Sequence, residues 1–322
     1  MSTKILVTGG AGFIGSNIVE ALINDDRVDL VRVIDDLSTG FYKNIAQFES
    51  NSKFEFFQAD ITDYENCLKA TDGINRITHQ AALGSVPRSI KNPLKTNSVN
   101  INGTLNIFTA AKENGIKRVV YAASSSTYGD SQSLPKQEDK IGNPLSPYAV
   151  TKLVNELYAK VYGSLYDIEL IGLRYFNVFG PKQDPSGAYA AVIPLFMKAI
   201  IENKEPTIHG DGTQSRDFTF VKNAVQANIK ALFTENKAAT NQVFNIAFGE
   251  RTDLNQLFDI LKEITGSELI PNHGAERVGD VKHSLADISK ARNYLGYDPE
   301  FDVKTGLNIA FEWYKKNLFQ KV

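Results

Sequence analysis

The chain has 322 residues, of which 42% are hydrophobic and 22% charged, and its formal net charge is −2. That length can bury a large core and is expected to form one large or two moderate domains. The small net charge argues against non-specific binding to nucleic acid. A single cysteine, Cys67, excludes an intramolecular disulfide and favours a reducing compartment. With no apolar run of ~18 residues and no signal-peptide pattern, we expect no membrane span and a cytoplasmic location.

Short apolar runs alternate with helix-like stretches through the first 180 residues. The expected strands are 4–8, 30–34, 54–57, 76–80, 118–123 and 169–173. The expected helices between them are 14–24, 64–70, 99–113 and 147–162. This alternation predicts βαβ units and a parallel sheet with helices on both faces, an α/β fold whose nucleotide-binding domain spans 1–180.

After about residue 180 the alternation stops, and the composition shifts toward loops rich in Gly, Pro and Asp. The shorter helices expected in this part are 190–202, 222–234, 254–265 and 304–317. We therefore expect a smaller, mixed α/β domain over 181–322 that binds substrate, with some of the chain returning to the sheet.

A glycine-rich turn joins the first expected strand to the first expected helix. It reads GGAGFIG, with the spacing GxxGxxG. Glycines let the backbone approach a pyrophosphate, and the helix N-terminus offers free N–H groups to its oxygens. The strand–turn–helix context predicts a dinucleotide site in a Rossmann-type, doubly wound sheet. The residues expected to form it are Gly9, Gly12, Phe13, Ile14 and Gly15.

Acidic and small residues stand at the ends of the next strands. Asp35 ends the second strand, where a carboxylate can accept hydrogen bonds from the adenosine ribose. Because Asp36 follows and no neighbour is basic, a 2′-phosphate would be repelled, so NAD is expected rather than NADP. Asp60 closes the third strand, where it could reach the adenine or serve as a turn residue. The small-residue segment that would let a cofactor pass the fourth strand is Gln80, Ala81 and Ala82.

Hydroxyl side chains and a Tyr–Lys pair follow the fifth expected strand. The run Ser124–Ser125–Ser126 lies at the carboxyl end of that strand, where ligands bind in open α/β sheets. Tyr148 and Lys152 are four residues apart on the next expected helix, so their side chains share one face. A cation beside a phenol lowers the phenol pKa, and such a tyrosine can act as a general base. Taken alone, the spacing is also typical of a surface pair.

The motifs together resemble those of extended short-chain dehydrogenases/reductases, specifically the nucleotide-sugar 4-epimerases that prefer N-acetylated sugars. The resemblance spans essentially the whole chain. The matching segments are TGGAGFIG at 8–15, HQAA at 79–82, NINGT at 100–104, SSSTYG at 124–129, YAVTK at 148–152, LRYFNVFGP at 173–181, GDGTQSRDF at 210–218 and RVGDVKHSLAD at 277–287.

This resemblance implies a UDP-N-acetylglucosamine 4-epimerase with tightly bound NAD and no metal. Tyr148 is then the base on the sugar 4-hydroxyl, Lys152 bonds the nicotinamide ribose, and Ser124 is the catalytic serine. Further cofactor contacts implied are Ser38, Gly40, Ile61, Asn100 and Tyr175. The UDP-sugar contacts implied are Gly84, Ser85, Ser124, Ser126, Tyr148, Asn177, Val192, Thr207, His209, Arg216, Arg277, Asp280 and Ser284, with both arginines on the diphosphate.

Two features bear on the reaction and its substrate. Related dehydratases and decarboxylases carry carboxylates where this chain has Ser125 and Ser126, so both reactions are disfavoured. The segment 84–89 resembles that of epimerases with N-acetylated substrates. Ser284 stands where glucose-restricted epimerases carry a tyrosine, so it leaves room for an acetamido group, unless it is simply an exposed loop serine. His283 beside it contacts substrate or merely lines the loop.

Several alternatives stay open at this point. The chain could also act on UDP-glucose, or on UDP-glucuronate or its N-acetylated acid, with Arg88 as the cation for the C6 carboxylate. A non-catalytic NAD-binding regulator is disfavoured by the presence of Ser124, Tyr148 and Lys152. The helices 97–113 and 147–162 resemble those of a superfamily dimer interface, so a homodimer is expected.

Overall fold

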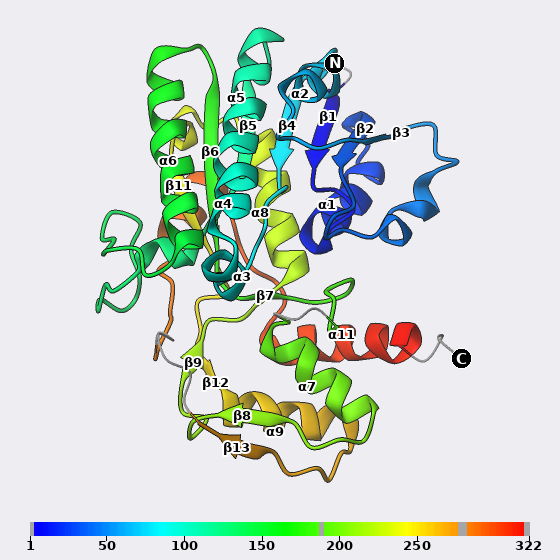
Figure 1. Ribbon diagram of the computed structural model, residues 1–322, viewed down its shortest axis with the longest axis vertical. Coiled ribbons are helices and arrows are strands. Elements are labelled where there is room, and N and C mark those ends of the chain that lie inside the picture. The colour runs from blue at the N-terminus through cyan, green and yellow to red at the C-terminus, as the bar shows by residue number, and fades with distance from the viewer. Residues whose placement is uncertain (1–2, 187–189, 276–281, 319–322) are drawn as a thin grey trace.

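The computed structural model describes residues 3–186, 190–275 and 282–318, and its centre is a seven-stranded sheet (Figure 1). All neighbouring strands in it are parallel, in the order β11-β6-β5-β4-β1-β2-β3. The predicted doubly wound α/β fold is therefore confirmed. The strands are β1 Thr3–Thr8, β2 Val28–Asp35, β3 Phe54–Gln58, β4 Arg76–His79, β5 Arg118–Ser124, β6 Glu169–Tyr175 and β11 Val243–Ile246.

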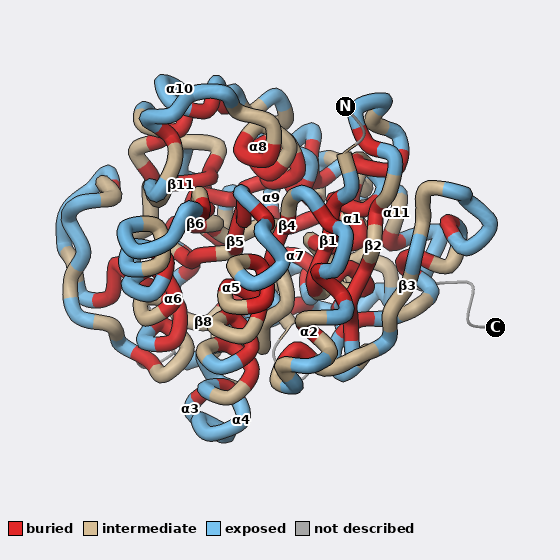
Figure 2. Tube along the Cα trace, turned by 90° about the horizontal axis from the view of Figure 1, so that it is seen from above, coloured by how far each residue is buried: buried red, intermediate tan, exposed pale blue. Residues whose placement is uncertain are grey.

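Two layers of helices cover the sheet, each over its own apolar core (Figures 1 and 2). Successive side chains of β5 point to opposite faces of the sheet and so contribute to both cores: Tyr121 packs into one cluster and Val120 into the other. One layer contains α2 Tyr64–Thr71, α5 Gly103–Glu113 and α6 Pro147–Leu165. The other contains α1 Phe13–Ile23, α8 Val221–Phe233 and α10 Ser289–Leu295. The strands lie buried between these layers (Figure 2).

A lower lobe lies beyond the carboxyl ends of the strands (Figure 1). Its core is a third apolar cluster that includes Phe179, Phe218 and Phe220. Its helices are α7 Val192–Ile201, α9 Leu254–Thr265 and α11 Val303–Leu318. Its short strands are β7 Val178–Phe179, β8 Thr207–His209, β9 Ser215–Arg216, β10 Thr219–Phe220, β12 Thr252–Asp253 and β13 Asn272–Gly274.

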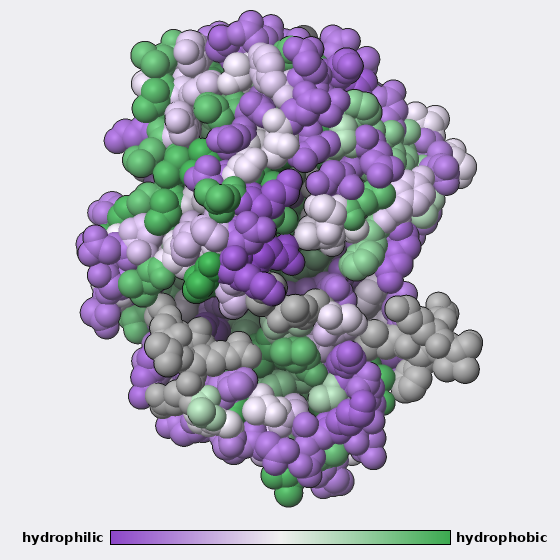
Figure 3. Space-filling view, viewed as in Figure 1, coloured by the Kyte–Doolittle hydropathy of each residue, from purple (hydrophilic) through white to green (hydrophobic). Residues whose placement is uncertain are grey.

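The chain after residue 180 contributes to both parts of the molecule. α8 packs against α1, and β11 extends the sheet beside β6. A boundary at residue 180 stays a prediction. Figure 3 shows the molecule hollowed between the sheet and the lower lobe, with apolar side chains visible in the hollow. No helix in the described ranges combines the length and the apolar character that crossing a membrane requires.

Two local features differ from the sequence prediction. Short helices α3 Val86–Lys91 and α4 Pro93–Asn97 follow β4, where no helix was predicted, although Ser85 as N-cap and Pro87 in the first turn are helix-start signals. The predicted helix 99–113 also begins differently, as a π-helical turn at Ser98–Asn102 that leads into α5. Such turns widen the backbone spiral and are frequent at functional sites.

Candidate active site

The glycine turn between β1 and α1 is packed so closely that side chains cannot fit. Gly9 has a φ of +66°, and a Cβ there would lie 2.7 Å from the backbone nitrogen of Ala81. A Cβ on Gly15 would lie 2.1 Å from the carbonyl oxygen of Gly9. Helix α1 begins after Gly12 without a side-chain cap, so its first-turn N–H groups are available to an anion.

A cavity of about 470 Å³ runs from this turn to the end of β5, and we call it the cofactor cavity. It brings together nearly all of the residues predicted to bind cofactor. Asn100 is the exception. The predicted residues that line the cavity are Gly9, Gly12, Phe13, Ile14, Gly15, Asp35, Ser38, Gly40, Asp60, Ile61, Gln80, Ala81, Ala82, Tyr148, Lys152 and Tyr175.

Acidic groups form the end of this cavity that would face an adenosine. Asp35 accepts hydrogen bonds from the backbone N–H groups of Ala11 (2.9 Å) and Leu37 (2.8 Å), which fixes its carboxylate. Burial raises the pKa of Asp35, and the neighbouring charge of Asp36 raises it further. Asp60 accepts a bond from the Thr62 N–H at 2.8 Å, so it forms a turn and lines the cavity as well. A doubly charged 2′-phosphate would be repelled here, which favours NAD.

The floor of the cofactor cavity is a fixed polar network. The Tyr175 hydroxyl donates to Gln80 Oε1 at 3.0 Å and accepts from Asn228 Nδ2 at 2.7 Å. Gln80 Nε2 in turn donates to Asn228 Oδ1 at 3.1 Å. Each group therefore has a partner, and the orientation of the floor is determined before any ligand binds.

Helix α6 delivers the Tyr–Lys pair to the end of β5. The side chain of Ser146 caps the helix by accepting from the Ala149 N–H at 3.1 Å. Tyr148 therefore lies in the first turn, next to Ser124 at the carboxyl end of the strand. Lys152 Nζ donates to the Ala122 carbonyl at 2.7 Å and lies 6.0 Å from the centroid of the Tyr148 ring.

The pKa values of this pair differ from the prediction. Burial raises the pKa of Tyr148, and only a hydrogen bond with Ser124 acts to lower it. Burial lowers the pKa of Lys152 to about 8. The prediction that Lys152 lowers the pKa of Tyr148 is therefore wrong for this structure. The physical reason is that burial penalises the charged phenolate, while the ammonium is directed at a carbonyl rather than at the phenol oxygen.

Asn100 lies outside the cofactor cavity, because its amide is fully engaged elsewhere. It is buried in the π-helical turn, where Oδ1 accepts from the Leu83 N–H at 2.8 Å and Nδ2 donates to Thr151 Oγ1 at 3.1 Å. The prediction of a direct cofactor contact is not supported by this geometry. Asn100 instead joins the segment after β4, including Leu83 of the cavity wall, to helix α6.

Two further cavities continue from the cofactor cavity, and we call them the middle and the distal cavity. Their volumes are about 520 and 490 Å³. Asn177 lines all three cavities, Ser124 lines the cofactor and middle ones, and Arg216 lines the middle and distal ones. Asn177 has a φ of +37°, a left-handed conformation that asparagine tolerates better than most residues. The three cavities are therefore neighbours that share wall residues in the region between sheet and lobe.

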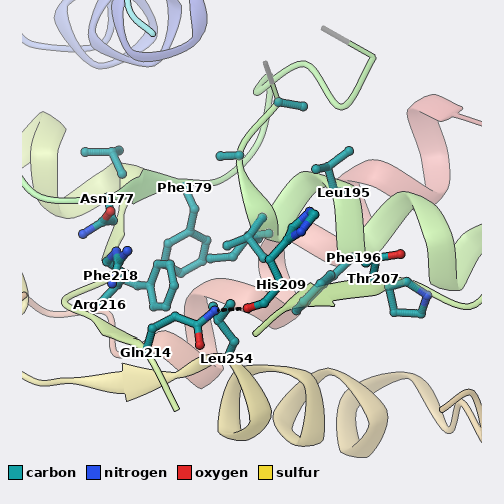
Figure 4. A pocket seen from close by; sticks show the side chains of 16 residues that line it. Asn177, Phe179, Leu195, Phe196, Thr207, His209, Gln214, Arg216, Phe218 and Leu254 are labelled. Carbon is teal, nitrogen blue, oxygen red and sulfur yellow. Dashed lines mark hydrogen bonds between the residues drawn. The ribbon is translucent and has the colours of Figure 1, made fainter. Parts of the chain in front are cut away.

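The distal cavity combines aromatic and polar walls (Figure 4). Gln214 Nε2 donates to the His209 carbonyl at 2.6 Å, which ties two of the lining segments together. Gln214, Phe179 and Phe218 line this cavity but were not predicted from the sequence. The predicted residues that line it are Asn177, Val192, Thr207, His209 and Arg216. The predicted Arg277 and Asp280 lie outside the described residues.

The middle cavity lies directly beyond Ser124. Ser126 Oγ donates to Ser124 Oγ at 2.9 Å, and both serines face this cavity. Ser284 lines it too, held by its backbone N–H on the Ser215 carbonyl at 3.0 Å. His283 is engaged with Ser215 Oγ at 2.9 Å and is not among the lining residues. Lys136, which the sequence did not single out, also lines the middle cavity.

The segment after β4 carries three other predicted residues. Gly84 and Arg88 line the cofactor cavity rather than the middle cavity. Ser85 caps helix α3 by accepting from the Arg88 N–H at 3.2 Å, and it lines none of the three cavities. Arg88 therefore lines the cavity that also contains Ser124 and Tyr148, and it is not among the residues that line the middle cavity.

The Ser–Tyr–Lys set on a Rossmann-type sheet defines the class of this protein as a short-chain dehydrogenase/reductase that uses NAD. The family model described as "NAD dependent epimerase/dehydratase family" matches residues 5–247, and the chain belongs to that family. The predicted family, enzymatic nature and NAD dependence are therefore confirmed.

Known relatives extend over the whole chain. It is 36% identical over 314 residues to a UDP-glucose 4-epimerase of Mycolicibacterium smegmatis, covering 97% of this chain and 98% of that one. A UDP-N-acetylglucosamine 4-epimerase from Methanobrevibacter ruminantium M1, solved with UDP-N-acetylmuramic acid, superposes with a TM-score of 0.92 at 39% identity and 98% and 99% coverage. A UDP-glucuronic acid 4-epimerase from Bacillus cereus, solved with UDP-glucuronic acid and NAD, gives 0.90 at 34% identity and the same coverage.

Proposed function

We propose that the protein is a nucleotide-sugar 4-epimerase that interconverts UDP-N-acetylglucosamine and UDP-N-acetylgalactosamine. The observation that carries this proposal is the set of three neighbouring cavities that share Asn177, with Ser124 between the cofactor and middle cavities and Arg216 between the middle and distal ones. A ligand that spans the middle and distal cavities presents its near end to Tyr148, where the cofactor cavity begins. Relatives whose names and structures record UDP-sugar 4-epimerases support the same reaction.

The chain's own groups account for the proton transfers of an epimerisation. NAD, when bound, supplies a reversible hydride acceptor for C4 of the sugar. Tyr148 takes the proton from the 4-hydroxyl and returns it after the 4-keto sugar has rotated in the site to present its other face. Ser124 hydrogen-bonds the same oxygen and orients it toward the phenol. Lys152 would hold the nicotinamide ribose through donors that its bond to the Ala122 carbonyl leaves available.

The high pKa of Tyr148 has a consequence for this step. A phenol that is protonated at neutral pH must lose its proton when substrate and cofactor are in place. Oxidised NAD, when bound in the cofactor cavity, would add a positive charge, which favours the phenolate. Tyr148 would therefore become a fully active base only when both NAD and the nucleotide sugar are bound.

The distal cavity suits a uridine diphosphate. Arg216 lies at its junction with the middle cavity, where a guanidinium can form paired bonds with phosphate oxygens. The ring of Phe218 and the amide of Gln214 offer a face for stacking and a polar edge for a planar base. The predicted contacts of Val192, Thr207 and His209 would complete this end.

The middle cavity has room for a substituted sugar. Its volume of about 520 Å³ leaves space beside a hexose, and Ser284 lines it with a small side chain. Val86 and Ile90 supply an apolar wall on which an acetamido methyl group could pack. These features support N-acetylated substrates, with unsubstituted UDP-glucose as a second substrate.

Product analysis by NMR tests the proposal. Purified protein is incubated without added NAD with UDP-N-acetylglucosamine, UDP-glucose or UDP-N-acetylglucosaminuronate. We expect the 4-epimer of UDP-N-acetylglucosamine to form and Tyr148→Phe to lower kcat by about 100-fold or more. Failure of the wild-type protein to epimerise any of the three sugars would contradict the proposal, as would full turnover by Tyr148→Phe.

We also propose that the enzyme is a homodimer formed through α5 and α6. The exposed side of α6 carries an apolar row whose members lie at helical spacing. Their exposed fractions are 46% for Val150, 56% for Leu157, 49% for Val161 and 67% for Leu165. A continuous apolar row of this kind is unusual on a free surface and typical of an interface. Analytical ultracentrifugation of wild type and Leu157→Glu tests it, since only the wild type should sediment as a dimer.

A further inference from the structure

Lys136 is a buried ammonium group inside the middle cavity. Its residue exposure is 4%, and it lines the cavity together with Ser126 and Ser284. No carboxylate of the described residues forms an ion pair with it. The recorded partners of Nζ are the carbonyl of Ser131 and, at 6.0 Å, the ring of Tyr128.

Nearby acidic side chains are directed elsewhere. Glu138, two residues further along the chain, accepts from the Asn245 N–H at 2.8 Å, and its charge acts on Lys290 and Arg174. Asp287 accepts from Gln137 Nε2 at 3.1 Å and from the Ser289 N–H at 2.9 Å. Among the residues that the structure describes, neither neighbouring segment therefore supplies a counter-charge to the ammonium.

The backbone holds Lys136 firmly at this position. Its N–H donates to the Leu285 carbonyl at 2.7 Å, and its own carbonyl accepts from the Asp287 N–H at 2.9 Å and Asn245 Nδ2 at 2.9 Å. The 284–287 segment thus supplies Ser284 to the cavity and fixes the residue beside it. Lys136 and Ser284 are therefore both fixed by backbone hydrogen bonds in the wall of the middle cavity.

The composition of the wall points to an anionic ligand. The cations of the middle cavity are Lys136 and Arg216, and its described lining contains no aspartate or glutamate. Removing an ammonium from water is unfavourable unless a partner compensates for the lost hydration. A carbonyl occupies only one of its three donors. A neutral side chain could hold the Ser131 carbonyl equally well, so the charge itself needs an explanation.

We infer that Lys136 is a specificity residue that binds a carboxylate carried by the hexose of the substrate. This inference rests on the proposed function, because it places the sugar in the middle cavity. It extends the substrate class to acidic N-acetylated sugars. The carboxylate can be C6 of a uronic acid or part of a carboxyalkyl ether on the ring, since both present the same chemistry. Arg88, the cation predicted for this role, faces the cofactor cavity instead.

Calorimetric titration tests the inference on the holoenzyme. The variants are Lys136→Met, which keeps the aliphatic stem, Lys136→Arg, which keeps a cation, and Lys140→Met as a matched control. Lys140 is exposed in the same loop and donates to Gln137 Oε1 at 2.6 Å. The ligands are UDP-N-acetylglucosaminuronate, UDP-N-acetylmuramate, UDP-N-acetylglucosamine and UDP.

We expect Lys136→Met to weaken binding of at least one carboxylated ligand by about 10- to 100-fold, as for loss of a charged hydrogen bond. Binding of UDP-N-acetylglucosamine and UDP should change less than about twofold, Lys136→Arg should restore most of the loss, and Lys140→Met should match the wild type. The affected ligand identifies whether the carboxylate is on C6 or on an ether.

Three results would overturn the inference. If Lys136→Met lost the same affinity for all ligands including UDP, Lys136 would contact the diphosphate or have a purely structural role. A lower melting temperature of this variant would favour the structural role. Unchanged binding of both carboxylated ligands would leave the ammonium without this role. A wild type that binds neither of the two carboxylated ligands would likewise exclude this role for Lys136. A wild type that binds these ligands but epimerises none of the nucleotide sugars would instead contradict the proposed function alone.

Discussion

Replacing Lys152 with methionine should make the protein more stable at neutral pH while removing its activity. The residue is 4% exposed, and burial lowers the pKa of its side chain from 10.5 to about 8. At about 1.4 kcal/mol for each pKa unit, this difference corresponds to about 3 kcal/mol of destabilisation of the charged form. Loss of the bond to the Ala122 carbonyl offsets about 1 kcal/mol. The expected gain at pH 7 is therefore about 2 kcal/mol.

The pH dependence provides the sharper test. Because the folded pKa lies below the unfolded value, the unfolded chain binds the extra proton between pH 8 and 10.5, and the contribution of Lys152 to stability rises with pH across that window. The destabilisation is fully present below pH 8 and is gone above pH 10.5. The amount by which the free energy of unfolding of Lys152→Met exceeds that of the wild type should therefore decrease as the pH rises from 8 to 10.5.

Urea unfolding of both proteins, freed of nucleotide, at several pH values from 7 to 10 measures this difference, with turnover followed in parallel. A variant that is less stable than the wild type at pH 7 would refute the reasoning. A stability difference that does not change with pH would refute it equally.

Substitutions at three other places in the structure test the geometry. Arg174→Met should lower the free energy of unfolding by about 3–5 kcal/mol, because the buried Glu156 carboxylate loses its two hydrogen bonds from the guanidinium, at 2.9 and 2.7 Å. Adding Glu156→Leu to the same chain should recover much of this loss. Urea titration measures both variants, and a double variant whose loss equals the sum of the two single losses would contradict the prediction. Ser284→Tyr should narrow the middle cavity and abolish turnover of UDP-N-acetylglucosamine but retain that of UDP-glucose; normal turnover of both by NMR would exclude a gate. Gly15→Ala should yield protein without bound nucleotide, because the new Cβ would meet the Gly9 carbonyl; retention of NAD, seen by absorbance, would show that the turn can relax.

Much of the site's location could be predicted from local patterns. The glycine turn, Asp35 and Tyr148 each stand at the end of an expected strand or start of an expected helix, and a parallel sheet brings such ends to one edge. Nearly every predicted cofactor residue therefore lines one cavity. Asn100 was misplaced because sequence spacing does not show where a side-chain amide finds its partners.

The amino-acid sequence by itself determined the fold class, the family and the nucleotide end of the site, because these depend on hydrophobic periodicity and on short motifs. Only the tertiary structure decided the charge states and the sugar end of the site. Burial reversed the expected pKa direction of Tyr148, a property that depends on neighbours from β5 and α6 together. Lys136 entered the cavity because strand-like pairing with 285–287 joins segments about 150 residues apart. Desolvation and long-range contacts of this kind leave no local pattern in the chain.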